Sequence, residues 1–500
     1  MSTQDQPIVL PDVAVVRAIV EDNFPDLWPA VDLGLSTAAT LLLAENTNPT
    51  AVIYVGGPST GKTTVATMFD GAMIEVNGKR ESLCYRSDKF TPASFVSQAA
   101  NQPTKALAKV DLLPRIKDKI LLTPELATIF RGKPDELTQT FSTITRVLDG
   151  QGLQTDSGTH GRRGYTGQHG FAWIGCTTPF EPQVWRVMAQ LGSRLFFLVM
   201  ETGRAVTVED LLTGSSGPSY PERLELCRAV VHKFLEELFV GYGGVRAVRW
   251  IAEDDPDARL WLARCAMVLA AMRAVPIEER DTDGGSKSYR PGQRELPFRA
   301  QAVLTNVARG HALAHGRRQV TMDDLPLVAA VTVSSMPGDT SAIFGALITN
   351  DGALTVEAVQ EVLKARHRET ARDRMRYLEA LGVVEFENPG PGKTSILRLR
   401  PDWAWCASPD FRALLSLDRV PVCRGKVRET GELVTDPGRC VAPITNNLVQ
   451  HQREEERRGG DTHIPQEMTG GNPAVVNGDS ADIWNSPINW DDIDQIETGA

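Results

Sequence analysis

The chain has 500 residues and a mass of 54.6 kDa, more than one ordinary domain of about 100–200 residues. Its 53 Lys and Arg against 63 Asp and Glu give a net charge of −10, so any contact with nucleic acid requires local basic patches. No apolar stretch is long enough to span a membrane, no secretory pattern opens the chain, and the seven cysteines form no Cys-x-x-Cys pair. We therefore expect a cytoplasmic protein without membrane contact or a disulfide framework.

Residues 1–48 are expected to form a helical lead-in. Apolar side chains at helical spacing predict a first helix over about 12–23. A run rich in Ala and Leu predicts a second helix over about 35–46. This segment leads into the part of the chain where the motifs begin.

Residues 49–205 alternate between apolar strands and helices. The first strand candidate is 51–55, followed by a glycine-rich loop and a helix. Further strand candidates are 120–123, 171–176 and 195–200, with helical stretches between them. This alternation predicts an α/β core with a mostly parallel sheet.

The loop after the first strand matches the phosphate-binding pattern G-x-x-x-x-G-K-S/T at every fixed position. The loop and the residue after it are Gly56, Gly57, Pro58, Ser59, Thr60, Gly61, Lys62, Thr63 and Thr64. Glycines allow backbone N–H groups to cradle the β-phosphate, while the Lys62 ammonium would neutralise β- and γ-phosphate oxygens. The Thr63 hydroxyl would ligate Mg²⁺. Because a strand precedes the loop and a helix follows it, we predict a site for ATP and Mg²⁺.

A P-loop ATPase needs an acid at the end of a nearby strand to hold Mg²⁺ and polarise water. The candidate is Glu125, just past the predicted strand 120–123. The Asp that usually precedes this acid is replaced by Pro124, a departure that bears on the rate of hydrolysis more than on ATP binding. Alternatively, Glu125 caps a helix that follows Pro124, and Asp111 is a second candidate acid.

Two further candidates lie near later strands of the core. Thr177 and Thr178 follow a buried strand, where a hydroxyl can orient the attacking water. Arg194 comes just before the last strand, a position that suits an arginine finger reaching into a neighbour's nucleotide site. The alternative for Arg194 is a surface salt bridge.

Residues 206–338 show helical periodicity and no strand alternation, which predicts an all-helical subdomain. Its expected helices are 222–239, 256–273, 298–315 and 322–332.

The order of P-loop, Glu125, polar strand end and Gly192–Phe196 resembles that of an AAA+ ATPase. The last stretch looks like the arginine-finger motif of minichromosome maintenance helicases and MoxR-type ATPases. The resemblance covers about residues 35–338 and implies a helical lid that carries a sensor-2 arginine, here Arg299. It also implies a ring or open homo-oligomer, with a hexamer as the expected form and Arg194 acting in trans.

The glycine-rich segment 149–167 falls where the helicase-like branch of that family has a pore hairpin that grips DNA. It carries Arg162 and Arg163, with His160 and Tyr165 beside them, a set suited to phosphate contact and base stacking. The alternatives are a surface hairpin with solvated arginines, or arginines that reach a γ-phosphate.

Residues 341–402 read as two helices, about 355–364 and 368–381, followed by a β-hairpin, which is the order of a winged helix. Its second helix is rich in arginine and the proposed wing tip adds a lysine; the candidate DNA contacts are Arg368, Arg372, Arg376 and Lys393. Winged helices also dock proteins, so both uses stay open.

The rest of the chain is predicted to be an irregular extension over 403–445 and a disordered acidic tail over 446–500. Within the tail, residues 479–497 hold Trp484 and Trp490 among acidic residues and resemble a peptide that docks on a protein partner.

Together these features predict an ATP-hydrolysing AAA+ protein that couples turnover to movement on, or remodelling of, DNA. One alternative is a MoxR-like ATPase that remodels a protein client. The other is an ATP-gated DNA-binding switch with little turnover, which the missing Asp before Glu125 favours.

Overall fold

The computed structural model describes residues 11–415 except 77, 98–103, 158–160, 193, 201–206, 209–216, 281–286 and 391–392. The chain divides into two compact units, Met1–Glu455 and Glu456–Ala500, and every described residue belongs to the first. His160, Ser193 and the predicted tail with Trp484 and Trp490 lie outside the described residues. Of the helices in the described part, none combines the length and apolarity needed to cross a membrane.

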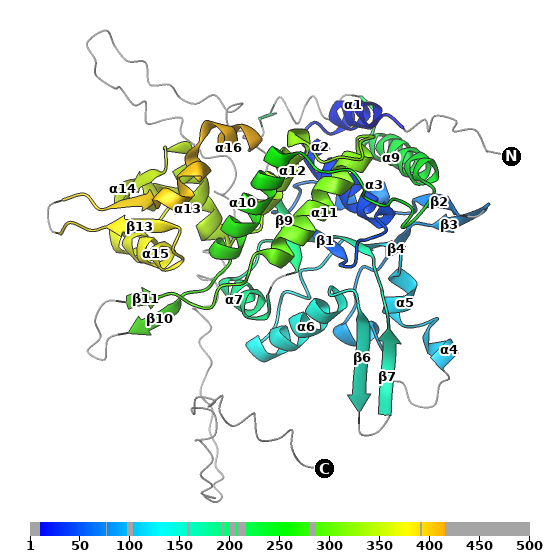
Figure 1. Ribbon diagram of the computed structural model, residues 1–500, viewed down its shortest axis with the longest axis horizontal. Helices are drawn as coiled ribbons and strands as arrows, with labels where there is room; N and C mark the ends of the chain where they lie inside the picture. Colours follow the sequence, from blue (N-terminus) through cyan, green and yellow to red (C-terminus); the bar gives the residue numbers. More distant parts are fainter. Residues whose placement is uncertain are drawn as a thin grey trace, which may run out of the picture. The chain divides into compact units, whose positions relative to one another are not determined.

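A five-stranded sheet in the order β4-β5-β8-β1-β9 lies at the centre, and all neighbouring strands are parallel (Figure 1). Its strands are β1 (Thr50–Val55), β4 (Cys84–Arg86), β5 (Ile120–Thr123), β8 (Ala172–Thr177) and β9 (Leu195–Val199). Every residue of β1, β5 and β8 is buried, as apolar runs in a parallel sheet covered on both faces must be. The predicted α/β class with a parallel sheet is confirmed.

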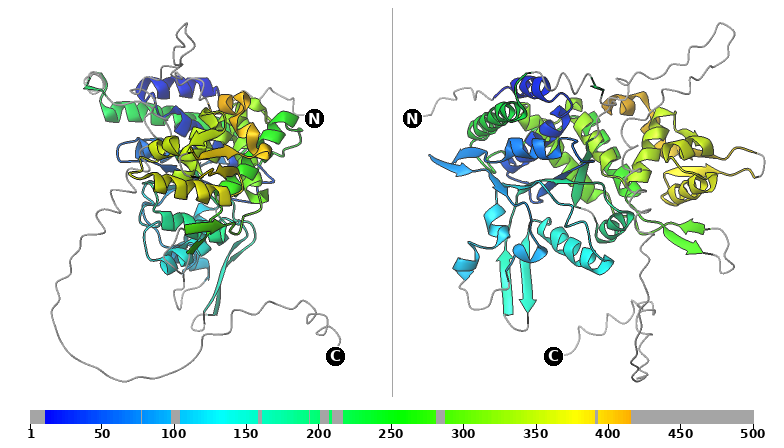
Figure 2. Two further views of the ribbon diagram at one scale, coloured as in Figure 1. Left: turned by 90° about the vertical axis from the view of Figure 1, so that its left-hand side faces the viewer. Right: turned by 180° about the vertical axis from the view of Figure 1, so that it is seen from behind.

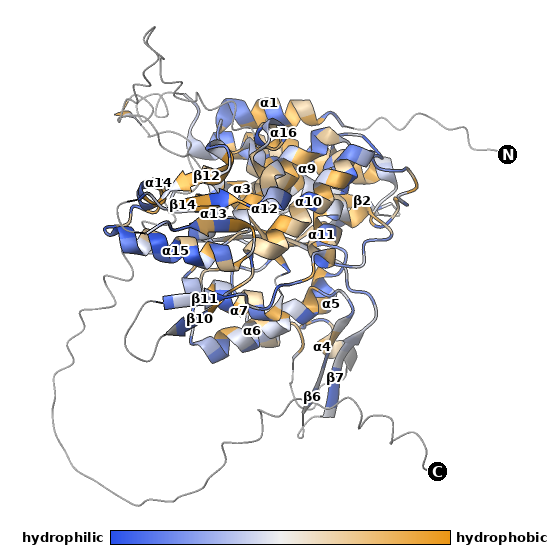
Figure 3. Cartoon of the chain, turned by 60° about the vertical axis from the view of Figure 1, so that its left-hand side comes forward, coloured by the Kyte–Doolittle hydropathy of each residue, from blue (hydrophilic) through white to orange (hydrophobic). Residues whose placement is uncertain are grey.

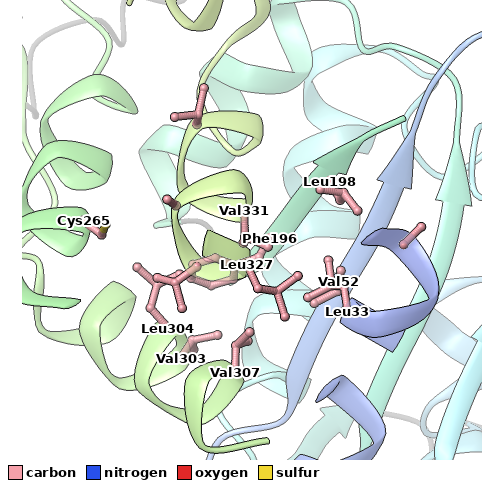
Figure 4. Close-up of a cluster of buried hydrophobic side chains, with 14 of the residues drawn as sticks. Leu33, Val52, Phe196, Leu198, Cys265, Val303, Leu304, Val307, Leu327 and Val331 are labelled. Carbon is pink, nitrogen blue, oxygen red and sulfur yellow. The ribbon is translucent and has the colours of Figure 1, made fainter. Parts of the chain in front are cut away.

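Alternate residues of each strand point to two separate hydrophobic clusters, one on each face of the sheet. Val52 of β1 belongs to the first cluster, and Ile53 belongs to the second. The first cluster also contains side chains from the helices that precede β1 and from those that follow β9 in the chain. Figure 4 shows the first cluster, where Leu33 and Val52 meet Phe196, Val307 and Val331. The second is built with α5 (Leu112–Ile116), α6 (Pro134–Val147) and α7 (Pro182–Leu191).

The N-terminal lead-in is helical, as predicted, but its second helix begins earlier than expected. The structure places α1 at Val13–Asn23, α2 at Trp28–Ala39 and a 3-10 turn at Thr40–Leu42, where the sequence suggested a helix over about 35–46. Pro29 in the first turn favours this earlier start. Nearly all of α2 is buried, and Tyr54 of β1 donates a hydrogen bond to the carbonyl of Ala30 at 2.7 Å.

Small elements surround the sheet strands. One antiparallel hairpin joins β2 (Met73–Val76) to β3 (Lys79–Ser82), and another joins β6 (Gly152–Ser157) to β7 (Gly161–Thr166). The β6–β7 hairpin extends away from the central sheet in Figures 1 and 2. The remaining elements of this part are α3 (Lys62–Phe69), a 3-10 turn at Pro92–Ser94 and α4 (Thr104–Leu107).

The following region is mainly helical. It contains α9 (Tyr220–Tyr242), α10 (Pro256–Met272), α11 (Phe298–Ala314), a 3-10 turn at Met322–Asp324 and α12 (Leu325–Ser334). Asp255 caps α10 through its carboxylate, and Pro256 occupies the first turn. The buried Arg273 guanidinium donates to the carbonyls of Leu195 and Ser335, both at 2.9 Å, and so joins these helices to β9.

The expectation that residues 206–338 are all-helical is wrong. An antiparallel hairpin joins β10 (Ile277–Arg280) to β11 (Lys287–Arg290). The strands are mostly charged and lack the alternation of apolar and polar residues that predicts a strand. The sequence therefore indicates a loop at this place. Cross-strand ion pairs hold the strands, with Arg290 2.7 Å from Glu279, and the Tyr289 ring packs edge-on against Tyr377.

Next come α13 (Gly338–Thr349), α14 (Val356–Val362) and α15 (Arg368–Ala380), with an antiparallel sheet in the order β12-β14-β13. Its strands are β12 (Ala353–Thr355), β13 (Val384–Glu387) and β14 (Ile396–Leu399). The expected pair of helices and hairpin is present, while α13 and β12 are additional. The sequence suggested that the helical region ends at residue 338 and that the next region begins at 341. The helix α13 begins at Gly338 and runs across this boundary.

The segment expected to be irregular from residue 403 begins with ordered helices. A 3-10 helix spans Pro401–Ala407 and α16 spans Pro409–Leu414. The Phe411 ring is stacked on Trp261 of α10 with centroids 5.8 Å apart, so aromatic burial orders this segment. Residues 416–445 lie outside the described part.

Candidate nucleotide site

The loop between β1 and α3 has the backbone of a phosphate-binding loop. Ser59 and Gly61 have positive φ angles of 64° and 85°, a conformation that is costly for a serine and recurs at functional sites. A Cβ on Gly56 would lie 2.6 Å from the carbonyl oxygen of Met200 and 2.7 Å from the Thr60 hydroxyl, so only glycine fits there. The loop turns directly into α3, whose first-turn N–H groups have no partner within the helix.

The Lys62 ammonium lies folded over this loop. It donates to the carbonyl of Gly56 at 2.7 Å and also to the carbonyl of Gly57 and the Thr60 hydroxyl. Burial lowers the pKa of Lys62, while the nearby Cys176 and Glu125 act in the opposite direction. The cation thus stands where phosphate oxygens would replace carbonyls as its acceptors.

Glu125 reaches the same edge of the sheet from β5. The backbone N–H of Leu126 donates to the carbonyl of Cys176 at 2.8 Å, which ties the segment after β5 to the end of β8. The Glu125 side chain is exposed and accepts a hydrogen bond from the N–H of Ala127 at 2.9 Å. Residues 127–130 form a turn rather than a helix, so the carboxylate caps this turn through one of its oxygens.

Thr177 ends β8 beside the P-loop strand. It is paired with Val55, and the N–H of Gly56 donates to its carbonyl at 3.3 Å. Its hydroxyl oxygen is buried and has no hydrogen-bond partner among the described residues, although leaving such a group unpaired costs about 1–3 kcal/mol. Thr178 is half-buried and follows directly. An unpaired hydroxyl next to a P-loop is suited to a ligand or an attacking water.

These groups fit a nucleotide with Mg²⁺. Oxygen ligands suit Mg²⁺, and both the Thr63 hydroxyl and the Glu125 carboxylate belong to exposed residues at the carboxyl edge of the sheet. Thr64, the next residue of α3, lies 2.9 Å from the Tyr220 hydroxyl of α9. Ligands of open parallel sheets bind at this edge, and β1 lies between two strands that come later in the chain.

Arg194 and Arg299 lie together at another place. Arg194 Nε and Arg299 Nη1 donate to the same oxygen of Asp149, at 3.2 and 2.8 Å. Arg194 Nη1 also donates to the carbonyls of Leu191 and Gly192. The Arg194 side chain is only 15% exposed, so the expected alternative of a surface salt bridge describes it incompletely.

This arginine pair lies at the amino edge of the sheet, opposite the P-loop. Leu195 is paired with Ala51, so Arg194 lies beside the start of β1, whereas the P-loop follows Val55. Five residues of strand separate the two edges by roughly 16 Å, further than an arginine side chain extends. The structure therefore does not bring Arg299 to the P-loop of its own chain, contrary to the expectation that it completes that site.

The basic segment 149–167 contains the β6–β7 hairpin. Arg162 is exposed and donates to Gln154, while Arg163 is half-buried with an Nε that has no partner among the described residues. Tyr165 is half-buried and its hydroxyl donates to Asp111 at 2.6 Å, while its stacking role stays a prediction. Asp111 is itself buried, and it anchors the hairpin rather than joining the nucleotide site.

The arginines of α15 divide between two faces of the helix, which is coloured mainly hydrophilic in Figure 3. Arg374 points inward and donates to Asp339 at 2.7 Å. The candidate contacts are partly neutralised. Arg368 is exposed and lies 3.2 Å from Glu357, while Arg372 and Arg376 are half-buried and lie 3.4 and 3.0 Å from Glu369. Lys393 is exposed, in the loop between β13 and β14.

Sequence reasoning missed Asp149 and Cys176. Asp149 begins the glycine-rich segment, and only the fold shows that two distant arginines converge on it. Cys176 lies next to the P-loop helix, where its thiol donates to the carbonyl of Lys62 at 3.3 Å and burial raises its pKa to about 12. Its place before Thr177 was visible, but nothing in the spacing marked it as a contact.

No protein-family model and no curated protein sequence matches this chain. Solved structures that match include a full-length MCM homolog from Methanopyrus kandleri, at 12% identity and a TM-score of 0.35, covering 67% of this chain and 64% of that one. This chain thus spans less than two thirds of that homolog. Two others are the apo C-terminal region of NrS-1 (10%, TM-score 0.25, 79% of each chain) and the active helicase Cch of SCCmec type IV (12%, 0.30, 81% and 75%). At these values, none of the three indicates what this chain binds or does.

Proposed function

We propose that the chain is a Mg²⁺-dependent ATPase of the AAA+ type that acts on DNA. The observation that carries the proposal is the carboxyl edge of the sheet, where a strained P-loop, the Lys62 ammonium, the Glu125 carboxylate and an unpaired Thr177 hydroxyl meet. In this proposal residues 49–205 are the nucleotide-binding core and 206–338 the lid.

Each residue has a distinct task in this site. Lys62 binds β- and γ-phosphate oxygens, and Thr63 and Glu125 hold Mg²⁺, which neutralises charge on the transferring phosphoryl group. Glu125 also polarises the attacking water, and Thr177, with Thr178 as the neighbouring choice, orients it. The remaining loop residues supply the backbone cradle.

In this proposal the active form is an oligomer. Arg194 and Arg299 share Asp149 at the edge opposite the P-loop, which supports a role for both at the nucleotide of a neighbouring chain. A ring or open homo-oligomer, with a hexamer as the form implied by the family resemblance, brings this edge of one chain to the P-loop of the next.

Two basic regions make DNA the favoured substrate. The projecting β6–β7 hairpin presents Arg162, with Arg163 behind it. In this proposal α14 and α15 with the β13–β14 hairpin act as a winged helix. Its second helix carries Arg368, Arg372 and Arg376 as the proposed phosphate contacts, with Lys393 at the wing.

The decisive experiment is ATP turnover with and without single- and double-stranded DNA at two salt concentrations. We expect DNA to stimulate turnover, and the stimulation to weaken with salt because phosphate contacts release counterions. Turnover indifferent to DNA would favour a MoxR-like remodeller of a protein client. Bound ATP without turnover would favour a nucleotide-gated switch, for which Pro124 in place of the usual Asp is the supporting observation.

A further inference from the structure

Two histidines at the end of α11 converge on a carboxylate of α2, away from the P-loop. His311 and His315 are four residues apart and therefore lie on the same face of the helix. His311 Nε2 lies 3.3 Å from one oxygen of Asp32, and His315 Nε2 lies 3.2 Å from the other. One ligand atom from each of the three residues lies within 4.8 Å of the others.

The three ligand atoms lie close enough together for one metal ion to bind all of them. Zinc binds imidazole nitrogen at about 2.0–2.1 Å and carboxylate oxygen at about 2.0–2.2 Å, so tetrahedral ligand atoms lie about 3.4 Å apart. A hydrogen bond between an imidazolium and a carboxylate is shorter, about 2.7–2.9 Å. The second nitrogen of His311 forms such a contact, with Nδ1 2.6 Å from Asp324. The two contacts with Asp32 are longer than this and involve different carboxylate oxygens, so the positions of both imidazoles are compatible with an ion shared through Asp32.

The residues around His311 include a carboxylate that can orient its ring, as the neighbours of metal-binding histidines do. Histidine ligands almost always donate their other ring N–H to a carboxylate or carbonyl, and Asp324 occupies that position. Asp324 is fully buried and is held by two Arg317 nitrogens, each at 2.8 Å, and by the N–H of Thr321. This network fixes the His311 ring with Nε2 toward Asp32.

The site is built on two rigid helices and has a route for entry. α2 and α11 approach so closely that a Cβ on Gly310 would lie 2.1 Å from the carbonyl oxygen of Ser36. Asp32 and His311 are buried, while the His315 side chain is 27% exposed. An ion can therefore reach the cluster past His315, and a water can complete its coordination.

We propose that Asp32, His311 and His315 bind one zinc ion, which joins α2 to the helical region at α11. Two imidazoles and a carboxylate favour zinc over Mg²⁺, which prefers an all-oxygen octahedron. This site is independent of the nucleotide site.

Without the ion, the same atoms form a network of ion pairs. Burial acts to lower the pKa of His311, but hydrogen bonds with Asp32 and Asp324 raise it to about 9, so an imidazolium bridges two carboxylates. Zinc takes the place of the proton on Nε2 and leaves the contact with Asp324 intact.

The test is zinc binding by the full-length chain after chelator treatment, measured by competition with a chromophoric chelator of known affinity. His315→Ala removes one ligand without touching Asp324, and His367→Ala is the matched control because His367 is an exposed histidine before α15. We expect the wild type and His367→Ala to bind one equivalent more than His315→Ala. Zinc should also raise the Tm of the first two and leave that of His315→Ala unchanged.

A cobalt titration identifies the ligands. We expect the visible bands of tetrahedral Co²⁺ without a thiolate charge-transfer band in the wild type, and their loss in His315→Ala and in the near-isosteric Asp32→Asn. Equal zinc stoichiometry in wild type and His315→Ala, or a thiolate band in their place, would overturn the assignment. Mg²⁺ in excess should not displace zinc, and displacement would also contradict the proposal.

Discussion

The two edges of the central sheet differ in how fully their polar groups are satisfied. At the carboxyl edge, the described residues offer the buried Thr177 hydroxyl no partner, and the hydrogen bonds of Lys62 within the described part of the chain are with its own loop. At the amino edge Arg194 and Arg299 are both bonded to Asp149. The first edge therefore has polar groups that a ligand could satisfy, whereas the cations of the second edge already have a carboxylate partner, and their action on a neighbouring chain is our proposal.

The largest expected effect is at the carboxyl edge. Lys62→Ala removes the cation from the phosphate site, and we expect ATP turnover to be abolished, because both phosphate binding and the stabilisation of developing charge are lost. Lys233→Ala is the matched control, since Lys233 is an exposed lysine of α9 that lies 3.8 Å from Glu237. Steady-state phosphate release measures both. Unchanged turnover in Lys62→Ala would refute the assignment of the nucleotide site.

The next effect tests the amino edge. Arg194→Ala removes the proposed finger, and we expect turnover to fall about 10³-fold, within the range for arginine fingers. Mixing Arg194→Ala with Lys62→Ala should restore part of the activity, because an intact P-loop of one chain then meets an intact arginine of the other. Turnover is measured across mixing ratios. No recovery at any ratio would contradict a site shared between chains.

Asp149→Asn should reduce turnover less than Arg194→Ala does, and it tests whether Asp149 acts together with the proposed arginine finger. Asp149 holds Arg194 through Nε, so its neutralisation loses a charge-assisted hydrogen bond of about 1.5 kcal/mol and lowers kcat roughly tenfold. Because this defect is on the finger side, Lys62→Ala should rescue it and Arg194→Ala should not. Rescue by both partners, or by neither, would show that Asp149 serves the fold rather than the finger.

How far the sequence predicted each edge depends on how local its signals are. The P-loop occupies one continuous stretch, Gly56–Thr63, whose spacing alone specifies a backbone cradle. The arginine pair depends on residues 45 and 150 positions away from Asp149, which no local pattern links. The position of Arg299 relative to the P-loop follows from the pairing of β9 with β1, which puts Arg194 and its neighbour Arg299 at the amino edge of the sheet. The sequence motif does not contain this information.

The remaining errors have a related cause, because tertiary partners changed what local patterns indicated. The β10–β11 hairpin is charged and lacks the alternation that marks a half-buried strand, so only its pairing and the contact of Tyr289 with Tyr377 reveal it. The hydrogen bond from the Tyr165 hydroxyl to Asp111, 54 positions earlier in the chain, is likewise a contact that no local pattern indicates. The segment after residue 403 is ordered because Phe411 finds Trp261 on a helix far earlier in the chain.

The smallest effects concern DNA binding by α15. Replacing Arg368, Arg372 and Arg376 by alanine should reduce DNA affinity and lower the salt slope by at most about 3, since each phosphate contact contributes about 1. Arg374→Ala is the control on the same helix: its guanidinium faces Asp339, so stability should fall while the slope stays unchanged.

Replacing Glu369 should change DNA affinity in the opposite direction. Glu369 pairs with both Arg372 and Arg376, so Glu369→Gln frees two guanidiniums for phosphates, and we expect DNA affinity to rise several-fold, most strongly at low salt. Fluorescence anisotropy over a salt series measures it. A merely structural α15 would not respond to this change with tighter binding. If affinity stays constant while the triple alanine variant also binds normally, α15 is a protein-docking helix and DNA contact rests on Arg162 and Arg163 of the hairpin.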